Sequence, residues 1–300
     1  MTDPELRRWL EARLGWSHAR QRLGVEQDHE GQIIGQGRTF FALENWASAP
    51  MLIDLALRLS LTWRRGRRNA AQVVLRHNKV RSHRLPAAFD GFTILHLSDL
   101  HADISEQALA RAADLVVGLA YDICVLTGDF RGRTHGGFAA ALRVMRGLVG
   151  GLTAPAYGVL GNHDTVRMLP ALEEMGLRVL MNECDKLERG DARIHLAGVD
   201  DAHFYRVDSI EKAAASIPRD EFAILLSHTP EVYRQAAHAG FDLMLSGHTH
   251  GGQICLPGRI PVTLDADLPR RLGAGAWRHH GMQGYTSVGL GTSVVPARFN

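Results

Sequence analysis

Cysteine is scarce in this chain of 300 residues, which contains three: Cys124, Cys184 and Cys255. They are far apart and form no Cys-x-x-Cys pair, so the sequence excludes a disulfide framework and a cysteine-based zinc site. Cys124 lies in the apolar run 123–126, where a thiol packs as a small hydrophobic side chain. We therefore expect reduced thiols, as is typical of a reducing compartment.

Long apolar runs are also absent. No run reaches the roughly 18 residues that a membrane-spanning helix needs. Residues 1–15 are charged and lack the apolar core of a secretory signal. The 45% hydrophobic and 22% charged content is typical of an ordinary globular protein. These observations predict a cytoplasmic protein whose only membrane contact would be peripheral, at the inner face of the membrane.

The net charge of +2 conceals an asymmetry along the chain. Residues 1–88 contain 15 Lys and Arg against 8 Asp and Glu, whereas residues 89–300 contain 19 against 24. We place a boundary here, between a basic, partly helical N-terminal extension (1–88) and an acidic domain (89–300). A basic extension suggests an anionic partner, but a helical arm with a solvated basic face explains the asymmetry equally well.

The most distinctive part of the extension is an apolar helix followed by a basic cluster. Residues 50–63 begin with proline and have apolar residues at helical spacing, and the arginine-rich cluster 64–68 follows directly. The whole segment, residues 50–68, could lie on an anionic membrane surface. Packing of the helix on the acidic domain is the commoner use of such a pattern, and both interpretations stay open.

From residue 89 onward, short runs rich in β-branched residues and leucine alternate with alanine-rich helical stretches. The predicted strands are 93–97, 122–127, 156–160, 193–199, 222–226 and 242–245. The predicted helices are 106–119, 138–148, 169–175, 210–215 and 231–239, with one more at 4–14 in the extension. Strands that alternate with helices predict an α/β fold with buried sheets.

Seven side chains of metal-binding type lie in five short motifs. The motifs are Asp99-Leu-His101, Gly128-Asp129, Gly161-Asn162-His163-Asp164, Ser227-His228 and Gly247-His248-Thr-His250. Each motif begins close to the end of an apolar run, and open α/β sheets collect ligands at the carboxyl ends of their strands. Any one motif could be an ordinary turn. Five of them in this placement predict a site for two adjacent divalent ions.

This ordered set of motifs resembles the calcineurin-like metallophosphoesterase superfamily over about residues 89–300. Segments 247–253 and 289–298 further resemble one branch, which includes membrane-associated bacterial phosphodiesterases and UDP-2,3-diacylglucosamine hydrolases. The resemblance implies a four-layer α/β/β/α sandwich of two mixed sheets, with the metals at one edge of the sheets. It also implies the ligands: Asp99, His101 and His250 for one metal, Asn162, His228 and His248 for the other, and Asp129 bridging both.

The chemistry of these residues agrees with that implication. An anionic bridge such as Asp129 is needed between cations roughly 3.5–4 Å apart, and a water between them loses its proton near neutral pH. The hydroxide would attack phosphorus, with His163 as general acid and Asp164 orienting the His163 ring and raising its pKa. A hydrogen bond from His163 to phosphate without proton transfer is the alternative. Manganese, zinc and iron all suit this ligand set.

The sequence departs from the superfamily pattern at one loop. The common Gly-Asp-x-x-Asp-Arg motif here has Gly132 in place of its second Asp. That carboxylate does not bind metal directly, so we expect metal binding to survive. On the same loop, Arg131, Arg133 and His135 are candidate phosphate contacts, or else ordinary surface charges.

We therefore predict a metal-dependent phosphohydrolase that acts on a phosphodiester or a pyrophosphate. A lipid pyrophosphate of the UDP-2,3-diacylglucosamine type, cleaved at the membrane surface, is the alternative that would explain residues 50–68. A nuclease is less favoured, because no aromatic residues interleave with arginine to form a stacking platform for nucleic acid. A non-catalytic binding protein is also less favoured, because a degenerate site loses ligands and none of the seven is missing.

Overall fold

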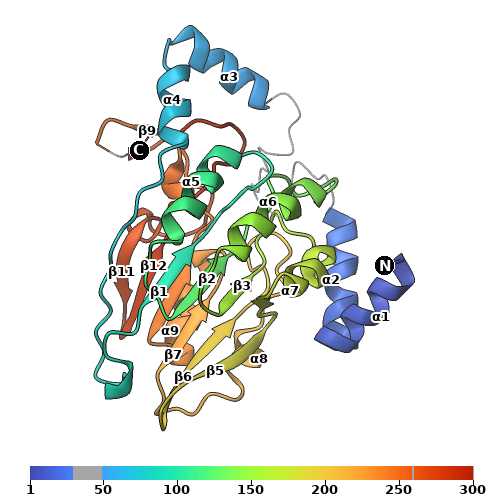
Figure 1. Cartoon of the computed structure of the whole chain (residues 1–300), viewed down its shortest axis with the longest axis vertical. Coiled ribbons are helices and arrows are strands. Elements are labelled where there is room, and N and C mark those ends of the chain that lie inside the picture. The colour runs from blue at the N-terminus through green and yellow to red at the C-terminus, as the bar shows by residue number, and fades with distance from the viewer. Residues whose placement is uncertain (30–48, 259, 300) are drawn as a thin grey trace.

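The computed structural model describes residues 1–29, 49–258 and 260–299. The six predicted strands are present in it as β1 (Ile94–Leu97), β2 (Ile123–Thr127), β3 (Ala156–Val159), β6 (Ala192–Gly198), β7 (Ala223–Leu226) and β8 (Leu243–Ser246). Six predicted helices are present as α1 (Asp3–Leu14), α5 (Glu106–Val116), α6 (Ala139–Gly150), α7 (Leu169–Glu174), α8 (Ile210–Ala214) and α9 (Tyr233–Ala239). Figure 1 shows their arrangement.

Several elements were not predicted. They are α2 (Trp16–His29), β4 (Leu177–Val179), β5 (Glu183–Arg189), β9 (Cys255–Leu256), β10 (Ile260–Pro261), β11 (Gly275–His279) and β12 (Met282–Thr286). Most are short or lie at sheet edges, where the alternation of apolar residues is weak. Of these, β4, β5, β11 and β12 extend the two large sheets, and β9 and β10 form a separate two-stranded sheet.

The strands form two large sheets. One has the order β1-β2-β3-β4, and each of its pairs is parallel. The other has the order β11-β12-β8-β7-β6-β5, with antiparallel pairs at its two edges. The six-stranded sheet is therefore mixed, as expected, but the four-stranded one is not. Its successive strands are joined through α5, α6 and α7, and helical crossovers produce parallel neighbours.

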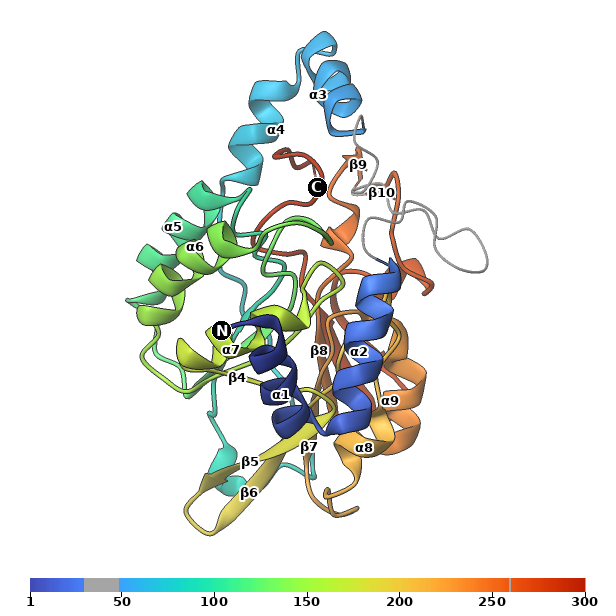
Figure 2. The same ribbon diagram turned by 90° about the vertical axis from the view of Figure 1, so that its right-hand side faces the viewer.

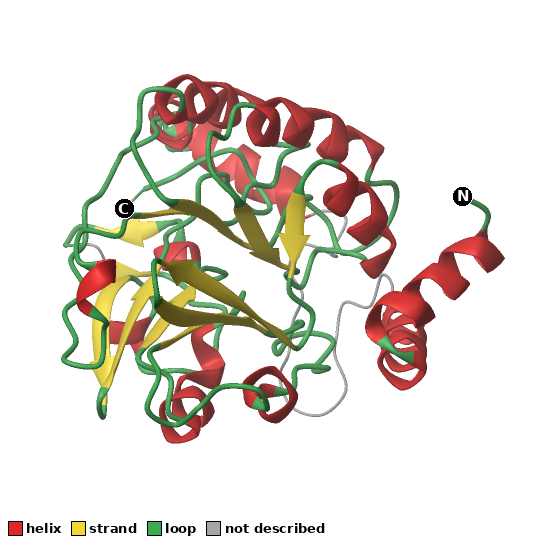
Figure 3. Cartoon of the chain, turned by 60° about the horizontal axis from the view of Figure 1, so that its bottom comes forward, coloured by secondary structure: helices red, strands yellow, loops and turns green. Residues whose placement is uncertain are grey.

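Three apolar clusters hold the layers together, and Figure 3 shows the two sheets stacked between helices. Successive residues of a strand point to opposite faces. In β2, Cys124 and Leu126 therefore contact the cluster beneath the helices, while Ile123 and Val125 contact the cluster between the sheets. A third cluster lies between the six-stranded sheet and helices α8 and α9. The result is the four-layer α/β/β/α sandwich.

The helix predicted at 50–63 ends earlier in the structure, and the basic cluster after it forms a helix of its own. α3 (Ala49–Leu59) ends before Leu61, whose φ of 58° a right-handed helix cannot accommodate. α4 (Trp63–Ala70) then carries the basic cluster 64–68. In Figures 1 and 2, α3 stands clear of the sandwich at one end of the molecule. In the described part of the chain, no helix is long and apolar enough to cross a membrane.

The first two helices are attached to the sandwich by their basic residues. The Arg13 guanidinium pairs with Glu173 and Glu183, which lie on α7 and β5. The side chain of Arg22 on α2 is fully buried and pairs with Asp200, which follows β6. Part of the positive charge of the extension is therefore neutralised by carboxylates of the domain itself. The boundary at residue 88 stays a prediction.

Candidate metal centre

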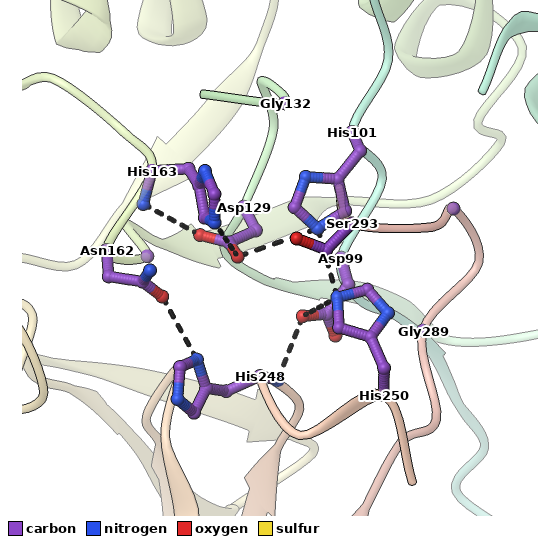
Figure 4. Close-up of polar contacts among 12 residues, drawn as sticks. Asp99, His101, Asp129, Gly132, Asn162, His163, His248, His250, Gly289 and Ser293 are labelled. Carbon is purple, nitrogen blue, oxygen red and sulfur yellow. Dashed lines mark hydrogen bonds and ion pairs between the residues drawn. The ribbon is translucent and has the colours of Figure 1, made fainter. Parts of the chain in front are cut away.

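The loops after five strands bring together the predicted metal-binding side chains and His163, the predicted general acid. Three of these strands belong to the four-stranded sheet and two to the six-stranded sheet, so the site lies at the carboxyl ends of both sheets. The side chains, most of which Figure 4 draws, are all buried: Asp99 and His101 after β1, Asp129 after β2, Asn162 and His163 after β3, His228 after β7, and His248 and His250 after β8.

These side chains form two groups that share one carboxylate. In each group, the possible ligand atoms lie within 4.8 Å of one another: Asp99, His101, Asp129 and His250 in the first, and Asp129, His228 and His248 in the second. The Asn162 Oδ1 atom joins the second group, 2.9 Å from Nε2 of His228 and 3.0 Å from Nδ1 of His248. Asp129 is thus the residue through which two neighbouring sites would be connected.

The orientation of the histidine rings suits metal binding. The Nε2 atoms of His101 and His250 are 3.1 Å apart, so their lone pairs point into one small volume. The opposite nitrogens of two rings face backbone carbonyls: Nδ1 of His101 is 3.0 Å from Arg131 O, and Nδ1 of His228 is 2.8 Å from Thr127 O. An N–H that donates to these carbonyls leaves Nε2 with its lone pair, as a metal ligand requires.

Backbone strain is concentrated at the same residues. Five of the predicted ligands have positive φ: Asp99 (51°), His101 (40°), Asp129 (54°), His248 (70°) and His250 (49°). This conformation is uncommon outside glycine and costs about 1–3 kcal/mol per residue unless the surroundings impose it. Clustered strain of this kind is typical of a functional site, in which the backbone adopts an unfavourable conformation to direct the side chains.

Two motif glycines allow this close packing. A β-carbon at Gly161 would overlap Oδ1 of Asp129, and one at Gly247 would overlap Ser98 Oγ and Asp99 Oδ2. The glycines of the Gly-Asn-His-Asp and Gly-His-Thr-His motifs are therefore needed because the metal-binding carboxylates lie directly against the backbone there. Any larger residue would displace a ligand.

The electrostatics of the site centre on one buried pair. Burial alone would lower the pKa of His228, but the negative charge of Asp129, 3.4 Å from Nε2, outweighs burial and raises that pKa to about 10. Burial likewise opposes the charge of Asp129, but His228 and its histidine neighbours hold the pKa of the carboxyl well below its usual range. Without a cation, His228 therefore keeps a proton. This proton supplies the positive charge that a bound divalent cation would otherwise bring.

Asp164 does not have the predicted role of orienting the His163 ring. Its Oδ1 accepts hydrogen bonds from the amides of Phe130 (2.8 Å) and Arg131 (3.3 Å), and its Oδ2 accepts one from Gly161 (2.9 Å). The carboxylate therefore ties the loop after β2 to the loop after β3. The expected rise in the pKa of His163 is also absent, because burial lowers that pKa to about 3.

Arg131 is not available as a phosphate contact. Its side chain is buried, and its guanidinium donates to the carbonyls of His163, Thr134 (2.7 Å) and Gly136 (2.8 Å). A guanidinium that satisfies three carbonyls of its own loop is a brace for that loop. The sequence could not distinguish this role, because an arginine next to a ligand suggests either function.

The remaining residues of the loop have different surroundings. Arg133 is exposed and His135 half-buried, so their role as phosphate contacts stays a prediction. Gly132, which departs from the superfamily pattern, donates its amide to the Asp103 carboxylate at 2.7 Å. A side chain there would press on Ile104 and Asp103. Asp103 thus supplies a carboxylate beside this loop, where the superfamily pattern has an aspartate within it.

The sequence interpretation missed His203, which lies beside the second group. Its ring centroid is 4.2 Å from that of His248, and its Nδ1 is 2.7 Å from Glu231. His203, His248 and Asp265 also come within the distances expected of metal ligands. A signal was present, because Asp200-Asp201-Ala-His203 directly follows the predicted strand 193–199 and thus obeys the same rule as the other motifs.

Arg22 is a second residue that the sequence could not reveal. Besides pairing with Asp200, it donates to the carbonyl of Asp164 at 2.8 Å and stacks on the Tyr205 ring at 3.6 Å. Burial opposes its charge, but the charge of Asp200 prevails and raises the pKa of Arg22 above its ordinary value. Helix α2 thereby supports the loop that carries Asn162 and His163.

Replacing Arg22 with methionine is expected to destabilise the fold by about 3–5 kcal/mol, because the buried Asp200 would lose its guanidinium partner. Urea denaturation of both proteins would measure the change. Arg20→Met is the matched control: Arg20 is exposed on the same helix, so the free energy of unfolding should change by less than about 0.5 kcal/mol. Equal stability of the two variants would show that the Arg22 cluster contributes nothing particular.

Comparison with known proteins places the chain in a family. The family model described as calcineurin-like phosphoesterase matches residues 92–252. The uncharacterized metallophosphoesterase YkoQ of Bacillus subtilis is 32% identical over 68% of this chain and 78% of its own length. Phosphodiesterase YaeI of Escherichia coli is 28% identical over 70% and 78%. A transmembrane protein with metallophosphoesterase domain from Danio rerio is 31% identical over 72% of this chain and 52% of its own length. The chain therefore belongs to the calcineurin-like phosphoesterases and is a metal-dependent enzyme that hydrolyses phosphoester bonds.

Proposed function

We propose that this enzyme uses two divalent cations to hydrolyse a phosphodiester or a pyrophosphate. The observation that carries the proposal is the sharing of the Asp129 carboxylate by two groups of ligands. A single carboxylate in both groups is what two closely spaced cations require, because it reduces their mutual repulsion. One isolated metal site would have no use for the second group of buried histidines.

The donor set fits such a centre. Carboxylate, imidazole and one amide oxygen suit manganese, zinc or iron. When bound, the two cations would polarise the phosphoryl group and lower the pKa of a water that attacks phosphorus. Asp99, His101 and His250 would hold one cation, and Asn162, His228 and His248 the other. The neutral oxygen of Asn162 would limit the negative charge of the ligand set.

We infer that His163 acts on the substrate and not as a ligand of the cations. Its backbone amide donates to Asp129 Oδ1 at 3.0 Å, which fixes the residue beside the bridging carboxylate. The ring lies edge-on to His101, with centroids 5.0 Å apart, and its buried Nδ1 has no hydrogen-bond partner in the protein. The ring is neutral when the site is empty, and the negative charge of a bound phosphate would favour its protonation. We assign it the transfer of that proton to the leaving oxygen.

A paired assay tests the proposed reaction. The manganese-loaded protein would be given bis(p-nitrophenyl) phosphate and p-nitrophenyl phosphate side by side. Faster cleavage of the diester is expected. The reacting phosphorus of the proposed substrates carries two ester groups, or one ester and one anhydride group, as the phosphorus of the diester carries two. Faster cleavage of the monoester would contradict the proposal and indicate a phosphomonoesterase.

Metal binding should release protons. His228 keeps its proton up to a pH of about 10 in the free site, whereas a bound cation needs the lone pair of Nε2. Below that pH the apparent affinity for manganese should rise about tenfold per pH unit, since one proton is displaced. Calorimetric titrations in buffers of different ionisation enthalpy would count the protons. Binding without proton release at pH 7 would contradict the expected protonation of His228 in the absence of a cation.

A further inference from the structure

Exposed apolar side chains gather at one end of the molecule. Large apolar side chains are exposed at sixteen positions among the described residues, and eight of them lie on two elements. Five belong to α3 and the turn after it: Met51 (65% exposed), Leu52 (47%), Leu55 (51%), Leu59 (76%) and Leu61 (91%). The other three belong to the hairpin β9–β10 and its end: Leu256, Ile260 and Val262. Both elements lie at the same end in the two views of Figures 1 and 2.

The direction of the apolar stripe on α3 is fixed by a polar cluster at the junction with α4. Asp54 accepts hydrogen bonds from Arg58 (2.5 Å) and from the indole of Trp63. The guanidinium groups of Arg58 and Arg67 lie over the Trp63 ring, 4.5 and 4.9 Å from its centroid. Leu52, Leu55 and Leu59 are spaced by three and four residues and thus share the opposite, exposed face. α3 is therefore held in one orientation relative to α4, and its leucines point outward.

α4 in turn packs against the C-terminal segment of the chain, which contacts the metal centre. Gly66 packs against Ala297 and Phe299, and its carbonyl accepts a hydrogen bond from Arg298 N at 3.1 Å. The Arg298 guanidinium donates to the carbonyl of Gly291 at 2.6 Å and to that of Gly289 at 3.3 Å. Gly289 lies against the side chains of Asp99 and His250. The exposed apolar end is thus connected to the catalytic loops by direct contacts.

The charge beside the apolar stripe that has no partner of opposite sign in the described structure is positive. Between Asp54 and Asp90 the sequence contains nine Arg and Lys residues and no carboxylate. Arg64, Arg65 and Arg68 of α4 are exposed. α1 and α2 direct basic residues to the carboxylates of the domain, whereas the described structure shows no acidic partner for these three arginines. Exposed leucines next to arginines without an acidic partner are complementary to a partner that has an anionic outer layer and an apolar interior.

We propose that α3, the turn 60–62 and the exposed apolar side chains of β9 and β10 dock this enzyme on an anionic lipid bilayer. The leucines of α3 would enter the interfacial region, and Arg64, Arg65 and Arg68 would contact the headgroups. At 11 residues, α3 is about 16 Å long, so it lies along the surface and does not span the bilayer. Docking would bring the metal centre close to amphiphilic phosphodiesters or pyrophosphates at a membrane surface. This point about the substrate rests on the proposed function.

Vesicle sedimentation tests the docking. The full chain is expected to sediment with vesicles that contain phosphatidylglycerol and to remain in solution with phosphatidylcholine alone. The double variant Leu55→Glu, Leu59→Glu should lose binding by about tenfold or more, because charges would enter the interface. The triple variant Arg64→Gln, Arg65→Gln, Arg68→Gln should lose on the order of a hundredfold at low salt. Val117→Glu, at the exposed apolar residue that caps the C-terminus of α5, is the matched control and should bind like the unmodified protein.

Three results would overturn the docking proposal. They are failure of the unmodified protein to bind anionic vesicles, equal binding by the leucine variants, and light scattering that shows a dimer dissociated by Leu55→Glu, Leu59→Glu. The milder pair Leu55→Gln, Leu59→Gln repeats the test should the glutamate variant not fold. Turnover of bis(p-nitrophenyl) phosphate separates this proposal from the catalytic one. It should be unchanged in every docking variant, so loss of vesicle binding with normal turnover supports docking, and absence of turnover in the unmodified protein contradicts only the proposed function.

Discussion

Replacing Asp129 with alanine is expected to remove at least one of two metal ions from each chain. Its Oδ2 atom lies 3.6 Å from Nε2 of His101 in the first group and 3.4 Å from Nε2 of His228 in the second. Without this carboxylate, no side chain bridges the two adjacent cations, and both sites lose a ligand. Because the metals contribute several kcal/mol of transition-state stabilisation, kcat/KM should fall on the order of a thousandfold. Metal content per folded chain would be counted by mass spectrometry.

A second variant separates charge from shape at the same position. Asp129→Asn keeps an oxygen that can accept the hydrogen bond from the His163 amide, but it lacks the negative charge. It should therefore fold like the unmodified protein and still bind fewer cations. The control is Asp191→Ala, which removes an exposed carboxylate between β5 and β6 and should retain both metals. Two ions per chain in Asp129→Ala would refute the assignment of the bridge.

The sequence predicted best those features that depend on local pattern. The six strands expected in residues 89–300 are mostly apolar runs, and β2, β7 and β8 are buried along their whole length. Such runs are visible without knowledge of their neighbours. β5 was missed because it is an edge strand of mostly polar residues in which Leu187 alone is buried. α2 was missed for a similar reason: its buried residues are Ala19, Arg22 and Leu23, which give no apolar stripe.

The metal centre shows the same limit. The motif positions could be predicted, because a polar residue directly after a buried strand lies at the end of the sheet. The direction of each side chain could not. Asp164 follows His163 in the chain, yet its carboxylate accepts hydrogen bonds from the backbone of another loop. Arg22 supports the site from more than a hundred residues away, through a buried charge pair that no local pattern encodes. Contacts between distant loops therefore decide the roles that residue type leaves open.

The general acid assignment gives the second large effect. His163→Ala is expected to keep both metals, because the hydrogen bond to Asp129 Oδ1 comes from the backbone amide, which alanine retains. Turnover should fall about 10²–10⁴-fold for a substrate with a poor leaving group, such as a phenyl ester, because the leaving oxygen would depart without a proton. A dinitrophenyl ester needs no such help, so its turnover should fall far less. A series of aryl diesters, assayed with the unmodified protein and the variant, would measure this dependence on leaving-group pKa.

Losses of equal size across the series would instead mean that His163 only binds phosphate. A steeper dependence in the variant would identify the ring as the proton donor. The pKa of His163 is near 3 when neither cations nor substrate is bound. The negative charge of a bound substrate would raise this pKa and favour the protonated ring.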